Sequence, residues 1–250
     1  MKKKAWQEFV KIREKYRFMV QKMLQDLPKL GMLEQKLIDS RSGPAYKIET
    51  AVVYNGALDD ITQTDTIKLI LVADNPGRRE QAAENRRYLV GPSGKIAEGF
   101  FRNHPELEID FRKNAIILNK TPVHTPRTAE LAELCSLGGA KLSEAINESQ
   151  KIMAELLLEF HRALAPIPVW IIGYSEMKKG GVFETYTEDL IDHYAKLPKR
   201  REEIFFFRHF SMNQFTIDFN KQALPKETAM ETLKRMGSAY RERVMGTKGN

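Results

Sequence analysis

The sequence contains a single cysteine, Cys135, among its 250 residues. An intrachain disulfide, a four-cysteine iron–sulfur cluster and a cysteine zinc site built within this chain are therefore excluded. The histidines outside the strand ends show no metal-ligand spacing, and they are His104, His124, His161 and His193. We accordingly expect no metal and no other cofactor.

Long apolar runs are also missing. Residues 1–4 carry the positive charge of a secretory signal, but Gln7 and several charged residues interrupt the segment where such a signal needs an apolar run. No stretch of the sequence is long and apolar enough to span a bilayer. We expect no membrane association and a reducing, cytoplasmic location.

The residues that are present describe an ordinary globular chain. Hydrophobic residues make up 42% and charged residues 29% of the sequence, which argues against disorder. A chain of this length can bury a sizeable core without disulfide or metal support. Lys and Arg outnumber Asp and Glu by 40 to 33, so the formal charge is +7. This excess is compatible with nucleic acid or another anionic ligand and does not choose between them.

Buried strands and amphipathic helices alternate along the chain. Apolar, β-branched segments predict strands at residues 67–72, 114–119, 169–173 and 203–208. Helical periodicity predicts intervening helices at about 94–103, 129–136, 140–164 and 182–196. Helical crossovers between buried strands indicate a parallel sheet that is covered on both faces. We predict an α/β fold, a three-layer α/β/α sandwich with a central, mainly parallel four-stranded sheet.

The two ends of the chain are predicted to be helical. An amphipathic helix begins near Trp6 and stops before Pro28, and a basic helix covers about 226–245. Residues 51–54 could form a short strand, and Ser93 is expected to cap the helix that follows the polar loop 78–92. Without a repeat or a linker, we expect one monomeric domain over 1–250, with an N-terminal helical extension at about 1–50.

Polar residues follow three of the predicted strands. In doubly wound sheets the ligand binds at the carboxyl ends of the strands. These ends carry the segments Ala73–Gly77, Leu118–Pro122 and His209–Asn213. Each segment alone is typical of a turn or a cap. Together they would place three polar groups on one edge of one sheet, which indicates a binding site.

The three segments resemble, in order, the motifs of the uracil-DNA glycosylase superfamily. Asn75-Pro76-Gly77 is similar to its first motif, Asn119 to the asparagine that ends a middle strand, and His209–Asn213 to its late histidine motif. Residues 89–94 also resemble a stretch of the iron–sulfur branches, whose cluster the single cysteine excludes. The resemblance covers residues 67–215. It implies a base-excision repair enzyme that flips uracil or a related deaminated base out of DNA and hydrolyses its N-glycosidic bond.

The resemblance also implies roles for the strand-end residues. His209 would donate a hydrogen bond to the base oxygen that gains negative charge. Asn119 would match the hydrogen-bonding edge of uracil, since its amide both donates and accepts. Asn75 would position the attacking water. An amide cannot take a proton at neutral pH, so stabilisation of the leaving group must carry most of the rate.

Further residues follow from the same resemblance. The stacking phenylalanine of the family falls on Leu89, with Tyr88 beside it. Met212 and Phe215 would form an apolar wedge that fills the gap left by the flipped base, or they would pack in the core. Backbone or phosphate contacts are expected from Pro76, Gly77, Gly91, Ser93 and Ser211.

The sequence departs from the family at two motif positions. Ala73 stands where the family has glycine, and Phe210 stands where it has proline. Two other functions stay open because function does not follow from fold. One is a non-catalytic nucleic-acid-binding protein of the same fold. The other is a small-molecule nucleoside hydrolase or transferase.

Overall fold

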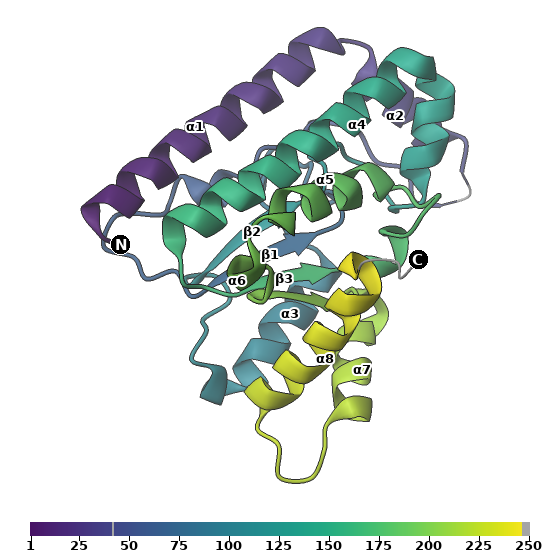
Figure 1. The fold of residues 1–250 in the computed structure, drawn as a ribbon. Coiled ribbons are helices and arrows are strands. Elements are labelled where there is room, and N and C mark those ends of the chain that lie inside the picture. The colour runs from purple at the N-terminus through teal and green to yellow at the C-terminus, as the bar shows by residue number, and fades with distance from the viewer. Residues whose placement is uncertain (42, 247–250) are drawn as a thin grey trace.

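Residues 1–41 and 43–246 are described by a computed structural model, so residues 42 and 247–250 of the predicted domain lie outside the described residues. The fold is built around a sheet of four parallel strands in the order β2-β1-β3-β4. Helices cover both faces of this sheet (Figure 1), which confirms the predicted three-layer α/β/α sandwich. The strands are β1 (Leu69–Ala73), β2 (Ala115–Asn119), β3 (Val169–Ile172) and β4 (Ile204–Phe207).

The strands form where the sequence is apolar on both faces. All residues of β1 and β3 are buried, as expected for a parallel sheet covered by helices on both sides. Val72 is paired with Leu118 on one side of β1 and with Ile171 on the other. The chain thus passes from β1 to β2 in one direction and returns across β1 to β3. This reversal makes the β1–β3 boundary the switch point where ligands bind in doubly wound sheets.

Two helical layers enclose the sheet. Figure 1 shows α1, α4 and α5 on one face and α3, α7 and α8 on the other. The first layer comprises α1 (Lys3–Asp26), α2 (Leu30–Asp39), α4 (Glu130–Leu164) and α5 (Glu184–Ala195). The second comprises α3 (Pro92–Asn103), α7 (Gln214–Gln222) and α8 (Ala229–Met245). The short helix α6 (Pro198–Arg201) precedes β4. No helix within residues 1–41 and 43–246 is long and apolar enough to cross a membrane.

Helix α1 packs against α4 rather than standing apart from the sandwich. Phe9 and Tyr16 on its inner face are fully buried, and the Phe9 ring lies 5.5 Å from that of Phe160. The predicted end of this helix before Pro28 is confirmed. The following helix α2 lies within the predicted N-terminal helical extension, although its own bounds were not predicted. The possible strand at 51–54 is reduced to a single bridge between Val52 and Val123.

The start of α3 differs from the sequence prediction. Gly91, not Ser93, is the N-cap of α3, and Pro92 occupies the first helical position, where its missing N–H leaves nothing unsatisfied. The prediction of two helical segments at 129–136 and 140–164 is confirmed, because α4 is broken at Gly139, whose φ of 72° is not helical. A capping box between Thr228 and Glu231 begins α8.

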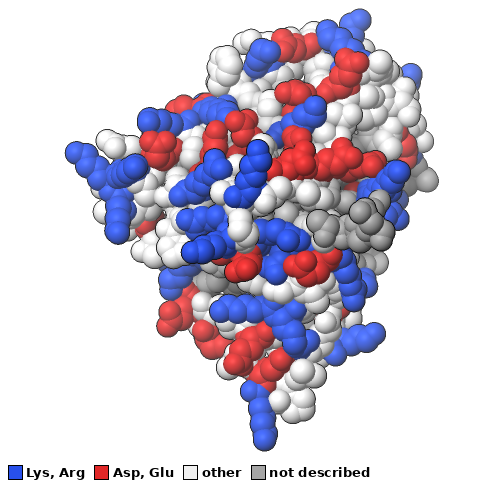
Figure 2. Space-filling model, viewed as in Figure 1, with Lys and Arg blue, Asp and Glu red and all other residues white. Residues whose placement is uncertain are grey.

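Charged side chains of both signs are interspersed over the surface. Figure 2 shows Lys and Arg beside Asp and Glu over much of the face in view. The net charge of +7 is therefore not gathered into one basic patch on this face. Charge by itself does not identify a binding surface there.

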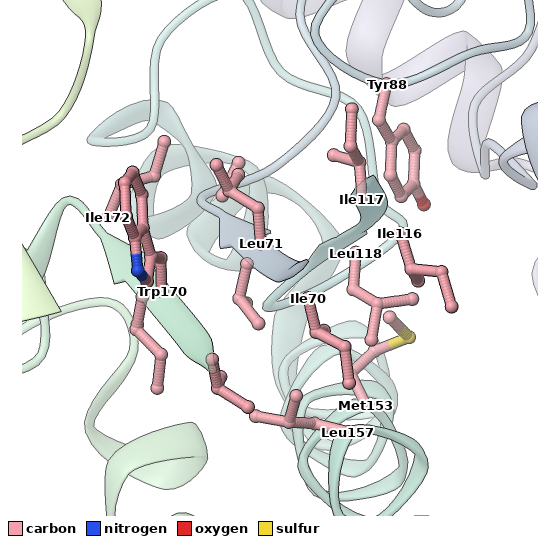
Figure 3. Packing of buried hydrophobic residues seen from close by; sticks show 14 of the residues in the cluster. Ile70, Leu71, Tyr88, Ile116, Ile117, Leu118, Met153, Leu157, Trp170 and Ile172 are labelled. Carbon is pink, nitrogen blue, oxygen red and sulfur yellow. The ribbon is translucent and has the colours of Figure 1, made fainter. Parts of the chain in front are cut away.

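The core fills the space between the sheet and the helices. In Figure 3, Ile70 and Leu118 of the sheet point toward Met153 and Leu157 of α4. These side chains are almost completely removed from water. Burying each one fully contributes about 1.5–3 kcal/mol to folding. The core thereby fixes the strand ends that carry the polar segments.

Candidate functional site at the carboxyl edge of the sheet

A cavity of about 780 Å³ lies at the carboxyl ends of the strands. Its walls include a polar residue from the end of each strand, namely Asn75 after β1, Asn119 of β2, Tyr174 after β3 and His209 after β4. The three segments singled out in the sequence therefore meet in one cavity. The end of β3 was not singled out, although the same strand-end rule applies to it.

The side chain of Asn75 is held by a neighbouring loop. Its Nδ2 donates to Oγ1 of Thr125 at 2.8 Å and to the carbonyl of Val123 at 3.3 Å. The Thr125 hydroxyl donates in turn to the carbonyl of Arg127. Both amide protons of Asn75 are thus engaged, and its Oδ1 remains an acceptor. Such a group can hold a water molecule but cannot remove its proton.

A buried histidine fixes the backbone next to Asn75. Nδ1 of His124 lies 2.8 Å from the carbonyl of Pro76, and its Nε2 lies 2.9 Å from the hydroxyl of Tyr46. Because a carbonyl only accepts, Nδ1 carries the proton and Nε2 accepts from Tyr46. Burial lowers the pKa of His124 to about 4. Pro76 does not line the cavity, and its role is this anchoring contact.

Asn119 presents an unsatisfied amide to the cavity. Its side chain is 1% exposed, and its Nδ2 has no hydrogen-bond partner among the described residues. A buried donor without a partner costs roughly 1–3 kcal/mol, so it is retained only where something else compensates. A ligand that offers an acceptor in the cavity would satisfy it.

The imidazole of His209 is oriented by Ser211. The backbone N–H of Ser211 donates to Nδ1 at 3.0 Å, and the Ser211 hydroxyl lies 2.9 Å from the same atom. Nδ1 therefore accepts, and the neutral ring carries its proton on Nε2. Burial lowers the pKa of His209, while the charge of Asp74 opposes this effect. The ring is accordingly a neutral hydrogen-bond donor at pH 7.

A buried ion pair lies beside these residues and was not found from the sequence. Lys120 has no exposed surface, and its Nζ donates to Oδ1 of Asp74 and to the carbonyl of Ile172, each at 2.6 Å. These contacts join the ends of β1, β2 and β3. Asp74 lines the cavity and also accepts from the Thr128 hydroxyl at 3.3 Å. Burial lowers the pKa of Lys120, and Asp74 opposes that shift.

The loop after Asn75 is closed by a buried carboxyl group. Oε2 of Glu80 accepts from the backbone N–H of Gly77 at 2.9 Å. Burial raises the pKa of Glu80 to about 7, although backbone N–H groups at Gly77, Leu89 and Val90 favour its charged form. The N–H of Gly77 is therefore engaged within the loop and is not free for phosphate. Gly91 and Ser93 line the cavity at the N-terminus of α3, an end that favours anions.

The structure corrects two of the apolar assignments. Tyr88 is buried away from the cavity, where its hydroxyl donates to the carbonyl of Val53 and contacts that of Tyr16. Phe215 is 0% exposed and packs against Phe210 at 4.5 Å between ring centroids, so it belongs to the core and is not a wedge. These aromatic contacts stabilise the interior, so neither the Tyr88 ring nor the Phe215 ring is available to contact DNA.

Two other apolar candidates keep positions that a ligand could reach. Leu89 lines the cavity with a positive φ of 53°. Met212 is 79% exposed in the turn η4 (Ser211–Asn213), with a φ of 52°. A bulky residue in the left-handed region is uncommon and is often maintained at functional sites. Met212 therefore remains the wedge candidate.

Basic side chains surround the cavity. The exposed residues Arg78, Arg79, Arg127 and Arg208 all contribute to its wall.

A larger groove, of about 900 Å³, lies near the N-terminus between α1 and the end of α4. That groove lies at the amino edge of the sheet, and its Lys15 is paired with Glu159 at 2.8 Å. The convergent polar groups lie at the carboxyl edge.

Comparison with known proteins matches this sequence to no family model and to no curated protein. The fold and the cavity define the class, a doubly wound α/β protein with a cavity lined by polar residues at the switch point of its sheet.

Proposed function

We propose that the protein is a DNA glycosylase that excises uracil or a related deaminated base. This proposal rests on one observation, that an imidazole donor and an amide donor line the same cavity. His209 has a neutral ring with its proton on Nε2, and Asn119 has a buried Nδ2 without a partner. A flipped uracil offers the acceptors that such donors require.

The reaction follows from these groups. Breaking the N-glycosidic bond leaves negative charge on the base and positive charge on the sugar. His209 donates to the base oxygen that gains charge, and a neutral donor gains strength as that charge develops. Asn119 recognises the base edge, and Oδ1 of Asn75 holds the attacking water. The Asp74 carboxylate lies in the same cavity, where a negative charge favours the sugar cation.

The surroundings of the cavity fit a DNA strand. The four arginines at its rim can bind backbone phosphates, which supply most of the affinity in protein–DNA complexes. Met212 can enter the gap left by the flipped base. Such an enzyme would act on DNA as a monomer, and we place it in the cytoplasm.

Excision assays test the proposal. Labelled oligonucleotides that contain uracil, hypoxanthine or xanthine are incubated with the protein, and alkali then cleaves any abasic site. We expect His209→Ala and Asn75→Ala each to lose at least about 100-fold in rate. His193→Ala on α5, outside the cavity, serves as the matched control. Asn119→Ala should lose discrimination between uracil and cytosine.

The same samples separate the alternatives. If the wild-type protein leaves all three oligonucleotides intact, the glycosylase proposal fails. Binding that persists with a steep salt dependence would then indicate a non-catalytic DNA-binding protein. Release of free base from uridine or inosine, without cleavage of oligonucleotides, would instead indicate a nucleoside hydrolase.

A further inference from the structure

One aromatic ring lines the cavity. Among the described residues that form its wall, Tyr174 is the single phenylalanine, tyrosine or tryptophan. It is half-buried and opens the turn η3 (Tyr174–Glu176), directly after Gly173 at the end of β3. Strand β3 lies between β1 and β4, and Asn75 and His209 follow the ends of these two strands. Tyr174 therefore follows the strand at the switch point and shares the cavity wall with the two groups proposed to act on the glycosidic bond.

Helix α8 supports this ring from behind. The Tyr174 and Tyr240 rings are 4.8 Å apart with an interplanar angle of 33°. Tyr240 is itself held, because its hydroxyl donates to Oδ2 of Asp218 at 2.8 Å. The same Asp218 carboxylate lies 3.9 Å from Nε of Arg208. Tyr240 of α8 thus contacts Tyr174 directly and is linked to Arg208 through Asp218 of α7.

The residues expected to stack on a ligand cannot supply a ring. Leu89 is aliphatic, and Tyr88 is turned into the core. A planar base held at its edge by Asn119 and His209 still needs a surface against its face. Stacking of a base on an aromatic side chain is a large, sequence-tolerant contribution to binding.

We propose that Tyr174, backed by Tyr240, packs its ring against the face of the nucleobase in the cavity. This inference deepens the proposed function, because it assigns the residue that holds the extruded base. It also applies to any nucleotide ligand of this cavity. Tyr174 then determines affinity for the base, whereas His209 and Asn75 act on bond cleavage.

The test compares binding with and without a base. An oligonucleotide with 2′-fluoro-2′-deoxyuridine resists cleavage, because fluorine disfavours the sugar cation, and a tetrahydrofuran analogue lacks the base. We expect the wild-type protein to bind the oligonucleotide with a base more tightly than the one without, and Tyr174→Phe to keep this ratio of affinities. Tyr174→Leu should lower the ratio about ten-fold. Tyr54→Leu, which removes a half-buried ring packed on Tyr16 outside the cavity, is the matched control. Tyr240→Leu should lose part of the preference.

A spectroscopic signal separates stacking from a general loss of structure. Protons H5 and H6 of uridine monophosphate should shift upfield on binding to wild type and Tyr174→Phe, and not on binding to Tyr174→Leu. If excision occurs but Tyr174→Leu keeps both the preference and the shift, stacking is refuted and the glycosylase stands. If no base is excised but the shift depends on Tyr174, the glycosylase proposal fails and stacking stands. If the wild-type protein shows neither the preference for the oligonucleotide with a base nor the upfield shift, the inference is also overturned.

Discussion

The backbone N–H of Ser211 donates a 3.0 Å hydrogen bond to Nδ1 of His209, and this contact decides which ring nitrogen can donate to a ligand. An N–H cannot accept, so Nδ1 must carry the lone pair. Phe210 is the N-cap of the turn η4, which begins at Ser211, and it stands where the resembled motif has proline. Phe210 is fully buried and anchors the turn through the aromatic core, so an apolar contact replaces the rigidity of a proline ring.

The first prediction concerns the protonation of His209. Because burial lowers its pKa below the ordinary value of about 6.5, the ring should be neutral at pH 7 with its proton on Nε2. Long-range ¹H–¹⁵N NMR spectra distinguish the two tautomers. Ser211→Ala keeps the backbone N–H and should keep the Nε2–H tautomer. A proton on Nδ1, or a positively charged ring at pH 7, would contradict the assigned donor role.

The second prediction concerns the buried ion pair. Lys120→Met leaves the Asp74 carboxylate buried without its cation, which should lower the free energy of unfolding by about 3–5 kcal/mol at pH 7. Part of this loss should return as the pH falls, since protonation removes the uncompensated charge. Urea denaturation measures both effects. Lys22→Met removes an exposed partner of Asp26 and should cost less than about 1 kcal/mol. Equal losses in the two variants would refute the burial argument.

The third prediction concerns Gly173. Its φ is 77°, and a Cβ at this position would lie 2.3 Å from Oδ1 of Asp74. Gly173→Ala should therefore lower the free energy of unfolding for two reasons, the conformational cost of a positive φ and a clash with the Asp74 carboxylate. Gly180 has a φ of 74° with no atom within 4 Å of such a Cβ, so Gly180→Ala should show only that conformational cost, roughly 1–2 kcal/mol. Similar unfolding free energies for the two variants would mean that Asp74 does not occupy this space.

The strands and most helices were predictable because their apolar periodicity is local. The Asp74–Lys120 pair was not, because it depends on the register that places Ala73 beside Asn119. Tyr88 and Leu89 are adjacent in sequence, yet the positive φ of Leu89 sends them to different surroundings. Sequence patterns also cannot distinguish a wedge from a core residue, as Phe215 shows. Tyr174 could have been found by applying the strand-end rule to β3 as well.

The last prediction concerns the pH dependence that Glu80 gives to the loop beside the cavity. Its side chain is buried, and its pKa is raised from 4.5 in the unfolded chain to about 7. The folded state therefore binds a proton more tightly, and the stability this provides is complete below pH 4.5 and is lost as the pH rises through 7.

Glu80→Gln removes this dependence, since an amide does not ionise. The difference in unfolding free energy between wild type and Glu80→Gln should fall by roughly 3 kcal/mol from pH 4.5 to 8, at about 1.4 kcal/mol for each pKa unit. Urea denaturation at several pH values gives this difference. A constant difference for Glu80→Gln would mean that its carboxyl group is as well solvated in the folded protein as in the unfolded chain.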